Sequence, residues 1–125
     1  MSQSQNTSKI SRRRAANAAG HAAEWLAAGW LLLKGYRILG RRYRVRLGEV
    51  DLIAAKGGVV TFVEVKMRRS IEDAQSALTR KGCQRSRSAA SRWLSARPRY
   101  LNLERRFDAV LIVPWRWPVH LPGAA

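Results

Sequence analysis

Cysteine and acidic residues are scarce in this sequence of 125 residues. A single cysteine, Cys83, excludes an intramolecular disulfide framework and any zinc site built on several cysteines. It fits a reducing cytoplasm, where we expect the protein to be located. Only 8 acidic residues stand against 24 lysines and arginines, which gives a formal net charge of +16. Such an excess predicts a polyanionic partner or a membrane surface, and it says nothing about the fold.

The sequence also lacks an apolar run long enough to cross a membrane. Three arginines at 12–14, followed by an Ala/Trp/Leu-rich run, imitate a targeting signal. However, Asn17, His21 and Glu24 interrupt that run and leave only residues 25–33 free of charge. A spanning helix needs about 20 apolar residues. We therefore interpret the run as a helix of a soluble fold and expect no membrane partner.

The N-terminal part divides into an arm and a helix. Residues 1–14 are rich in Ser, Gln, Asn and Arg, which predicts a disordered basic arm ahead of one domain over residues 15–125. Helical spacing of apolar residues predicts a helix over 15–34 that ends at Gly35. Its predicted buried stripe consists of Ala19, Ala22, Ala23, Leu26, Trp30 and Leu33.

The rest of the chain alternates between strand and helix patterns. A hairpin turn is expected at 56–58, and Pro98 is expected to stop the second helix. The expected elements, in chain order, are strands over 36–45, 47–55 and 59–67, a polar connection over 68–77, a helix over 79–97, a strand over 106–113 and a Trp/Pro-rich tail. This αβββαβ order predicts an α/β fold with a mixed β-sheet flanked by helices.

Charged residues interrupt two of the apolar strand patterns. Because side chains alternate along a strand, Glu49 and Asp51 are expected on one side of the first, and Glu64 and Lys66 on one side of the second. The opposite, packed side is expected to take Val50, Leu52, Val63 and Val65. Carboxylates set into apolar strands cost free energy unless they pair with a cation or hold a metal ion. The pattern therefore predicts a site.

Five ordered blocks lie between about Gly20 and Pro114. They are Gly20-x-x-Ala23-Glu24, Gly35-Tyr36-Arg37-Ile38-Leu39, Gly48-Glu49-Val50-Asp51-Leu52-Ile53-Ala54, Phe62-Val63-Glu64-Val65-Lys66-x-Arg68 and Arg106-Phe107-Asp108. Together they resemble the bacterial UPF0102 (YraN-like) family. That family is similar to the PD-(D/E)xK restriction-endonuclease-like superfamily and to archaeal Holliday junction resolvases. The resemblance implies a restriction-endonuclease-like core. Two departures are the basic run at 41–44, where the family often has an Asn, and the missing glycine within 68–71.

The residues and the resemblance together imply a metal-dependent site. Asp51 and Glu64, on strands joined by a short turn, are expected to converge on Mg²⁺, or on Mn²⁺ in its place. The resemblance implies a further ligand in the backbone carbonyl near Val65. Lys66 is expected to orient or help deprotonate the attacking water and to counter charge at the phosphate. Glu24 matches the family's helical acid, which either completes the site or holds a metal-bound water.

Residues outside this set have plainer expected roles. Glu49 is expected to pair with Lys66 or Arg68 beside the site. Asp108 is expected to pair with a nearby arginine at a strand start, and His120 is interpreted as incidental. The five tryptophans are expected to fill the core or brace the tail rather than to stack on bases.

Two basic segments predict contact with a phosphate backbone. The second helix carries its cations without an acid on the same side, whereas a plain solvated face usually mixes signs. The predicted nucleic-acid-binding residues are Arg12, Arg13 and Arg14 in the arm and Arg80, Lys81, Gln84, Arg85 and Ser88 on the helix.

Two functions remain open from the sequence. The first is a metal-dependent endonuclease that hydrolyses phosphodiester bonds of DNA, in branched or in recombination and repair intermediates. The second is a non-catalytic nucleic-acid-binding module of nuclease fold that acts through partners. DNA is the expected nucleic acid, and a homodimer or a larger repair or recombination complex is the expected assembly. Retention of Asp51, Glu64 and Lys66 together favours the endonuclease.

Overall fold

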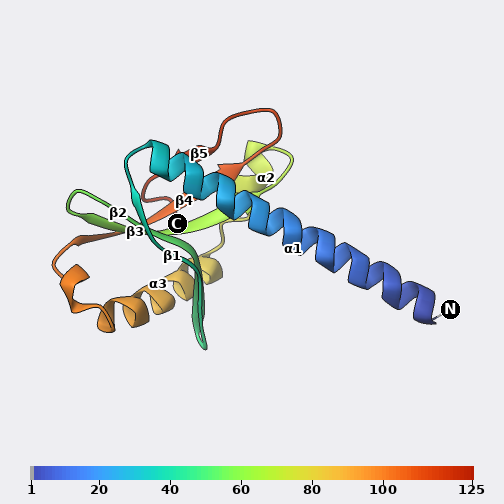
Figure 1. The fold of residues 1–125 in the computed structure, drawn as a ribbon, viewed down its shortest axis with the longest axis horizontal. Coiled ribbons are helices and arrows are strands. Elements are labelled where there is room, and N and C mark those ends of the chain that lie inside the picture. Colours follow the sequence, from blue (N-terminus) through green and yellow to red (C-terminus); the bar gives the residue numbers. More distant parts are fainter. Residues whose placement is uncertain (1) are drawn as a thin grey trace.

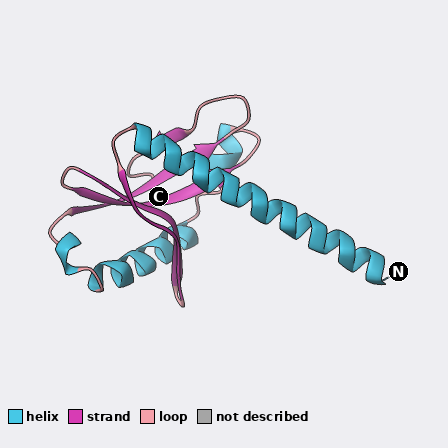
Figure 2. Cartoon of the chain, viewed as in Figure 1, coloured by secondary structure: helices cyan, strands magenta, loops and turns pink. Residues whose placement is uncertain are grey.

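A five-stranded mixed β-sheet carries helices on its two faces (Figures 1 and 2). The computed structural model describes residues 2–125, without the side chains of residues 2–8 and Ala16. The strands lie in the order β1-β2-β3-β4-β5, and β3 and β4 are parallel while the other neighbours are antiparallel. Their bounds are β1 (Arg37–Val45), β2 (Gly48–Lys56), β3 (Val59–Met67), β4 (Glu104–Ile112) and β5 (Val119–Leu121). The predicted α/β class is confirmed, and the sheet is consistent with a restriction-endonuclease-like core.

Helix α1 (Ser2–Leu33) is longer than the sequence predicted. Residues 2–14, expected as a disordered arm, continue the helix and project from the sheet (Figure 1). These residues include no proline or glycine, so nothing in them ends a helix. At the other end Gly35 adopts a left-handed φ of 92°, and Tyr36 N–H donates to the Leu31 carbonyl, as in a Schellman cap.

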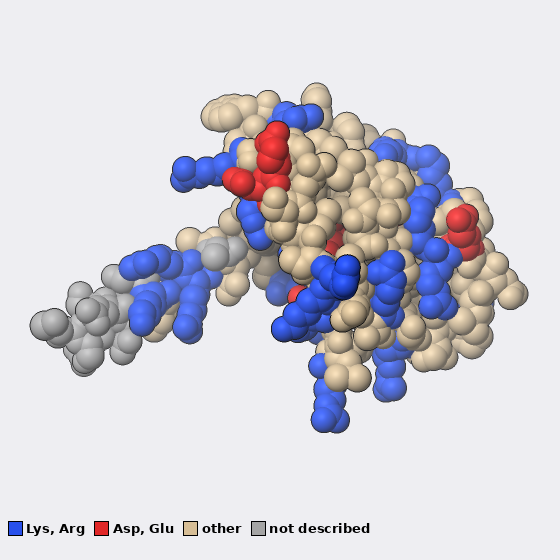
Figure 3. All heavy atoms as spheres, turned by 180° about the vertical axis from the view of Figure 1, so that it is seen from behind, with Lys and Arg blue, Asp and Glu red and all other residues tan. Residues whose placement is uncertain are grey.

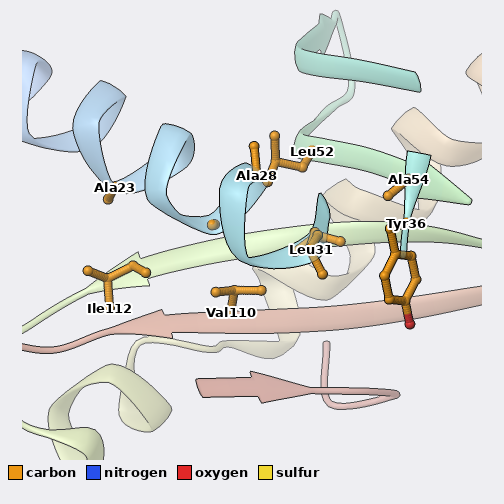
Figure 4. Close-up of a cluster of buried hydrophobic side chains, with 10 residues drawn as sticks. Ala23, Ala28, Leu31, Tyr36, Leu52, Ala54, Val110 and Ile112 are labelled. Carbon is orange, nitrogen blue, oxygen red and sulfur yellow. The ribbon is translucent and has the colours of Figure 1, made fainter. Parts of the chain in front are cut away.

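The stripe predicted for α1 is buried at Ala23 but has the wrong phase over the rest of the helix. Ala27, Ala28 and Leu31 are buried against the sheet, whereas Leu26 and Leu33 are 56% and 81% exposed. Small alanines let the helix approach the strands closely, and Leu52, Ala54 and Val110 complete this core (Figure 4). The larger Leu/Trp stripe has the same helical spacing but lies outside this core, so spacing alone could not distinguish the two.

Helix α3 (Arg80–Ser95) covers the opposite face of the sheet. Thr79 caps its N-terminus by accepting a hydrogen bond from the Gly82 N–H. Its apolar residues Ala89, Ala90, Trp93 and Leu94 are buried there, at the spacing of one helix face. They pack on Ile53, Val60 and Phe62, which alternate along β2 and β3 with the residues facing α1.

Three short elements were not predicted. Helix α2 (Ile71–Ser76) interrupts the polar connection, and Ser70 caps it. The 3-10 turn η1 (Pro98–Tyr100) follows α3, and β5 adds an edge strand within the tail. All three are shorter than seven residues, so hydrophobic periodicity gives them little signal. No helix in residues 2–125 is both long and apolar enough to cross a membrane.

Candidate active site

Strands β2 and β3 separate at one end of their ladder, and the charged residues of both strands lie in this fork. The two strands pair from Lys56↔Val59 as far as Leu52↔Val63. Beyond that point β3 continues beside β4 as far as Met67, while β2 stays paired with β1. A carboxylate of β2 bridges the gap: Asp51 Oδ2 accepts a hydrogen bond of 2.8 Å from the Val65 N–H.

Asp51 is held in a partly buried position near other negative charges. Its side chain is 19% exposed, and its other oxygen lies 3.6 Å from Arg44 Nη1. Burial raises the pKa of Asp51 above its ordinary value, and the charges of Glu24 and Glu64 raise it further, although the Val65 N–H and Arg44 act in the opposite direction. The protein therefore holds this carboxylate where a nearby cation would stabilise its ionised form.

Glu64 and Lys66 share one side of β3, as the alternation predicted. Lys66 Nζ lies 3.0 Å from Glu64 Oε1. Glu64 Oε2 is buried and has no hydrogen-bond partner among the described residues. The first turn of α3 lies against this carboxylate, because a Cβ added to Gly82 would stand 3.4 Å from Glu64 Oε1. Glu64 thus keeps one oxygen free for a further cation.

Glu24 approaches the fork from α1. It is only 7% exposed, and its Oε1 lies 3.5 Å from Arg41 Nη1 and 3.9 Å from Arg42 Nε. Two consecutive strand residues normally point to opposite faces. Arg42 has a left-handed φ of 54°, which breaks the alternation where both arginines reach the same carboxylate. Glu24 Oε1 makes no hydrogen bond to any described residue, so these are ion pairs only.

Two hollows meet at the fork and share Asp51, Val65 and Lys66. The one on the α3 side, of about 170 Å³, is also lined by Glu49, Glu64, Gly82, Arg85 and Ser86. The one on the α1 side, of about 340 Å³, is also lined by Ala19, Gly20, Ala23, Glu24, Met67 and Arg68. The structure therefore brings together all four predicted catalytic residues and the residue whose carbonyl was the expected ligand.

The two residues expected to support the site have other partners. Glu49 Oε2 lies 3.4 Å from Arg44 Nε and 3.7 Å from Arg85 Nη2, rather than beside Lys66 or Arg68. Arg68 donates to the Met67 carbonyl at 2.7 Å. Arg44 stands directly opposite Glu49 in the β1–β2 register, a cross-strand pairing that the local pattern could not reveal.

Close approach of α3 to β2 depends on Gly48. A Cβ at this position would stand 1.9 Å from the Arg85 carbonyl oxygen, so any other residue would push the helix away from the strand. The glycine of the Gly-Glu-x-Asp block thus brings Arg85 and Ser86 to the hollow. The local pattern indicates a role for the acids of this block but not the reason for its glycine, which depends on a contact with the distant α3.

The donor set fits a hard divalent cation that keeps part of its water shell. Among residues 2–125, no three His, Cys, Asp or Glu side chains cluster closely enough to enclose an ion by themselves. Asp51 and Glu64 offer two carboxylates, one with a raised pKa and one with an unpartnered oxygen. Mg²⁺ is commonly held by one or two carboxylates, with water and phosphate oxygens completing its shell.

The predicted phosphate-binding side chains lie on exposed surfaces. Lys and Arg side chains gather along the projecting part of α1 and in groups over the body (Figure 3). Residues 12–14 are exposed on α1. The predicted residues of α3 are also exposed, namely Arg80, Lys81, Gln84, Arg85 and Ser88. Arg85 joins this face to the fork, because it lines the hollow on the α3 side.

A second charged cluster surrounds Asp108 on β4. Its carboxylate is fully buried and accepts two hydrogen bonds from Arg106, at 2.7 and 2.8 Å, one from the Gly123 N–H at 2.9 Å and one from His120 Nε2 at 2.8 Å. Lys34 Nζ can only donate, so its contact with His120 Nδ1 leaves the Nε2 of that ring as the donor to Asp108. The predicted Arg–Asp pair is confirmed, and the interpretation of His120 as incidental is wrong.

Comparison with known proteins identifies relatives over most of the chain. The model of a family described as "Uncharacterised protein family UPF0102" matches residues 23–112. A UPF0102 protein of Mesorhizobium japonicum is 53% identical over 112 residues, which cover 90% of each chain. One of Rhizobium meliloti is 52% identical over 105 residues, covering 84% of this chain and 86% of the relative. One of Brucella canis is 50% identical over 112 residues, covering 90% and 89%.

Proposed function

The chain belongs to the UPF0102 family, and we propose that it is a metal-dependent endonuclease that hydrolyses phosphodiester bonds of DNA. One observation carries the proposal: Asp51, Glu64 and Lys66 converge where β2 and β3 separate, with a raised pKa on one carboxylate and an unpartnered oxygen on the other. Such a combination is typical of a site that is completed by a cation.

Asp51 and Glu64 would hold the cation, Mg²⁺ or Mn²⁺, together with the backbone carbonyl of Val65. When bound, such an ion lowers the pKa of a coordinated water and neutralises charge on a phosphate oxygen. The Val65 N–H fixes Asp51 Oδ2 at 2.8 Å, so this carboxylate is oriented before any ligand arrives. A pre-oriented ligand loses less conformational entropy on binding.

Lys66 would supply a positive charge next to the reacting phosphate. Its ammonium lies 3.0 Å from Glu64 Oε1 and is 24% exposed, so it is both positioned and accessible. There it would orient the attacking water and stabilise the negative charge that develops on the phosphate. Glu24, across the hollow on the α1 side, would accept a hydrogen bond from a water near Asp51.

The basic face of α3 and the projecting part of α1 would hold the DNA backbone. Phosphate contacts position a duplex without reading its sequence, so recognition would depend on DNA shape. Arg85 lines the hollow that contains Glu64, so the backbone-binding face continues into the fork.

The test is cleavage of fluorescent branched, single-stranded and duplex substrates with Mg²⁺ or Mn²⁺. Wild-type protein should cut at least one DNA substrate, and Asp51→Asn and Glu64→Gln should abolish cutting while they retain DNA binding. Glu104→Gln, an exposed acid at the start of β4, is the matched control and should cut normally. Equal cutting by Asp51→Asn and wild type would contradict the proposal.

The ion pair between Lys66 and Glu64 favours a second candidate, a nucleic-acid-binding module without catalysis. In such a module Lys66 would serve only as the counter-ion of Glu64. Lys66→Met would then lower stability by several kcal/mol without changing any reaction. In the endonuclease, Lys66→Met with Mg²⁺ should stay folded and bind DNA, and single-turnover cleavage should fall by roughly two to four orders of magnitude.

A further inference from the structure

An apolar groove opens on the surface between α1 and the loop over residues 113–118 that joins β4 to β5. Its volume is about 750 Å³, and four of the five tryptophans line it: Trp25, Trp30, Trp115 and Trp117. Trp25, Trp115 and Trp117 are 61%, 103% and 76% exposed. Exposed apolar area of this kind marks a binding surface rather than a packing defect.

Three of the four tryptophan rings of the groove contact another side chain of the protein. Trp30 stacks on Trp117, with 5.8 Å between ring centroids and 21° between planes. The Arg41 guanidinium lies 4.4 Å from the centroid of Trp25. Trp115 has a left-handed φ of 66°, which is rare for a bulky residue, and its ring is in solvent. The loop thus presents the uncovered ring of Trp115, with Arg116 next to it in the chain.

Charge argues for an anionic occupant. Arg116 is the one charged residue of the described chain that lines the groove, and no acid does. The protein carries a net charge of +16, so a second copy of the chain would approach against strong repulsion. A nucleic-acid strand combines planar bases with an anionic backbone, and its bases stack on tryptophan without regard to sequence.

The groove lies next to the hollow on the α1 side of the candidate active site. Met67, at the end of β3, lines both the groove and the hollow that contains Glu24, Asp51 and Lys66. It follows Lys66 directly in the chain. A strand whose phosphate lies at Asp51 would therefore have its neighbouring nucleotides at the tryptophans.

We propose that this groove stacks the unpaired bases of a nucleic-acid strand whose scissile phosphate lies at Asp51 and Glu64. The position of that phosphate rests on the proposed function; the stacking of bases does not. Paired bases inside a continuous duplex cannot reach the rings. The substrate class is therefore DNA with a single-stranded segment next to the cut, such as a flap, a fork or a frayed branch point.

The test compares two strands of equal charge in EDTA, where no cleavage takes place. One is oligothymidylate of about 20 nucleotides, and the other is an abasic strand of the same length. Wild-type protein should bind oligothymidylate about tenfold more tightly or better. Trp115→Ala should remove most of this difference and leave abasic binding unchanged, while Trp115→Phe should retain it. Leu101→Ala, an exposed apolar side chain outside the groove, is the control and should behave as wild type.

Other occupants of the groove would give different results. Equal binding of the two strands by wild type, or equal weakening of both by Trp115→Ala, would overturn the proposal. The proposal would also be overturned if binding did not depend on bases and the groove had another occupant. Self-association in sedimentation velocity that Trp115→Ala abolishes would indicate a second copy of the chain. Binding to vesicles of anionic phosphatidylglycerol that Trp115→Ala abolishes would indicate a membrane surface. Trp115 makes no ring stack or cation–π contact with any described residue, so its removal should not unfold the protein.

Cleavage then separates this inference from the proposed function. If wild type cuts DNA but binds both strands alike, the endonuclease stands and the stacking groove fails. If wild type cuts nothing but Trp115→Ala loses base-dependent binding, the groove stands and the endonuclease fails. If both hold, flap and fork substrates should be cut about tenfold faster than duplex, and Trp115→Ala should remove that preference.

Discussion

Two aspartates on the same sheet, Asp51 and Asp108, are placed in opposite electrostatic environments. Burial by itself would raise the pKa of Asp108, but hydrogen bonds from His120, Arg106 and the Gly123 N–H outweigh it and hold the pKa well below its ordinary value. Burial also raises the pKa of Asp51, and one backbone hydrogen bond and the Arg44 guanidinium at 3.6 Å do not offset it. Asp108 accepts four hydrogen bonds, whereas Asp51 accepts one.

This difference distinguishes a structural carboxylate from one that is available to a ligand. Four donor hydrogen bonds leave Asp108 nothing to offer a cation. The fork instead gathers Asp51, Glu64 and Glu24, and each glutamate has a buried oxygen that accepts no hydrogen bond from the described residues. Free energy lost by holding these charges close would be recovered when a cation binds.

Asp108→Asn should lower the free energy of unfolding by about 3–5 kcal/mol, because it leaves the Arg106 guanidinium without its counter-ion. Divalent metal should not restore the loss. Urea denaturation with and without Mg²⁺ measures the effect, with Glu104→Gln as the control. A loss below about 1 kcal/mol would mean that the Asp108 cluster is not a structural centre.

Asp51→Asn should shift stability in the opposite direction. The asparagine can still accept from the Val65 N–H, and it removes the repulsion from Glu24 and Glu64. Without metal, the melting temperature should rise by about 2–5 °C relative to wild type. With Mg²⁺, wild type should have the higher melting temperature, since only wild type is stabilised by binding the ion. Thermal melts in EDTA and in Mg²⁺ measure the change in melting temperature under both conditions. A lower melting temperature of metal-free Asp51→Asn than of wild type would show that Asp51, like Asp108, stabilises the fold.

The two aspartates should also give opposite pH dependences in metal-free protein. The raised pKa of Asp51 means that its protonation favours the folded state, so its contribution to stability grows as the pH falls from 7 toward the unfolded value of 3.8. The lowered pKa of Asp108 means that its contribution is present above 3.8 and is lost as the pH falls below it.

Urea denaturation from pH 7 to pH 3 measures these contributions. The stability advantage of Asp51→Asn over wild type should shrink as the pH falls toward 4. Below pH 4, the free energy of unfolding of wild type should fall more steeply with pH than it does above pH 4, because Asp108 then becomes protonated. An advantage that does not change with pH would show that the charge of Asp51 is not the cause.

The smallest effect concerns DNA binding in the absence of metal. Glu64→Gln removes the counter-ion of Lys66 and frees its ammonium for a phosphate. Affinity for a DNA duplex in EDTA should rise roughly 2- to 5-fold at low salt, and the gain should disappear at high salt because exposed charges are screened. Fluorescence anisotropy measures both affinities, with Glu104→Gln as the matched loss of one negative charge. An equal gain in the control would assign the effect to net charge alone.

The sequence predicted the strands and the acidic fork because both depend on local alternation. The spacing of Asp51, Glu64 and Lys66 within apolar strands was enough to place them together. Contacts between distant residues gave no such signal. Glu49 pairs across strands with Arg44, and His120 reaches Asp108 from the tail. Such partners follow from register and topology, which a single sequence does not reveal.

The error on α1 has a different cause. Two stripes with helical spacing share this helix, one of alanines and one that includes Leu26, Trp30 and Leu33. Hydrophobicity favours the second as the core, but close packing on the sheet selects the first. The residues mistaken for core line the tryptophan groove instead. Apolar periodicity therefore identified the face of α1 that carries Leu26, Trp30 and Leu33, but it could not tell whether that face packs on the sheet or lines a surface groove.

Calorimetric titration with Mn²⁺ measures metal binding at the fork itself, without DNA and without cleavage. Wild type and Glu104→Gln should bind the ion with equal affinity, and Asp51→Asn and Glu64→Gln should each weaken it about tenfold or more. Equal Mn²⁺ affinity in wild type, Asp51→Asn and Glu64→Gln would contradict the assignment of the fork as a metal site.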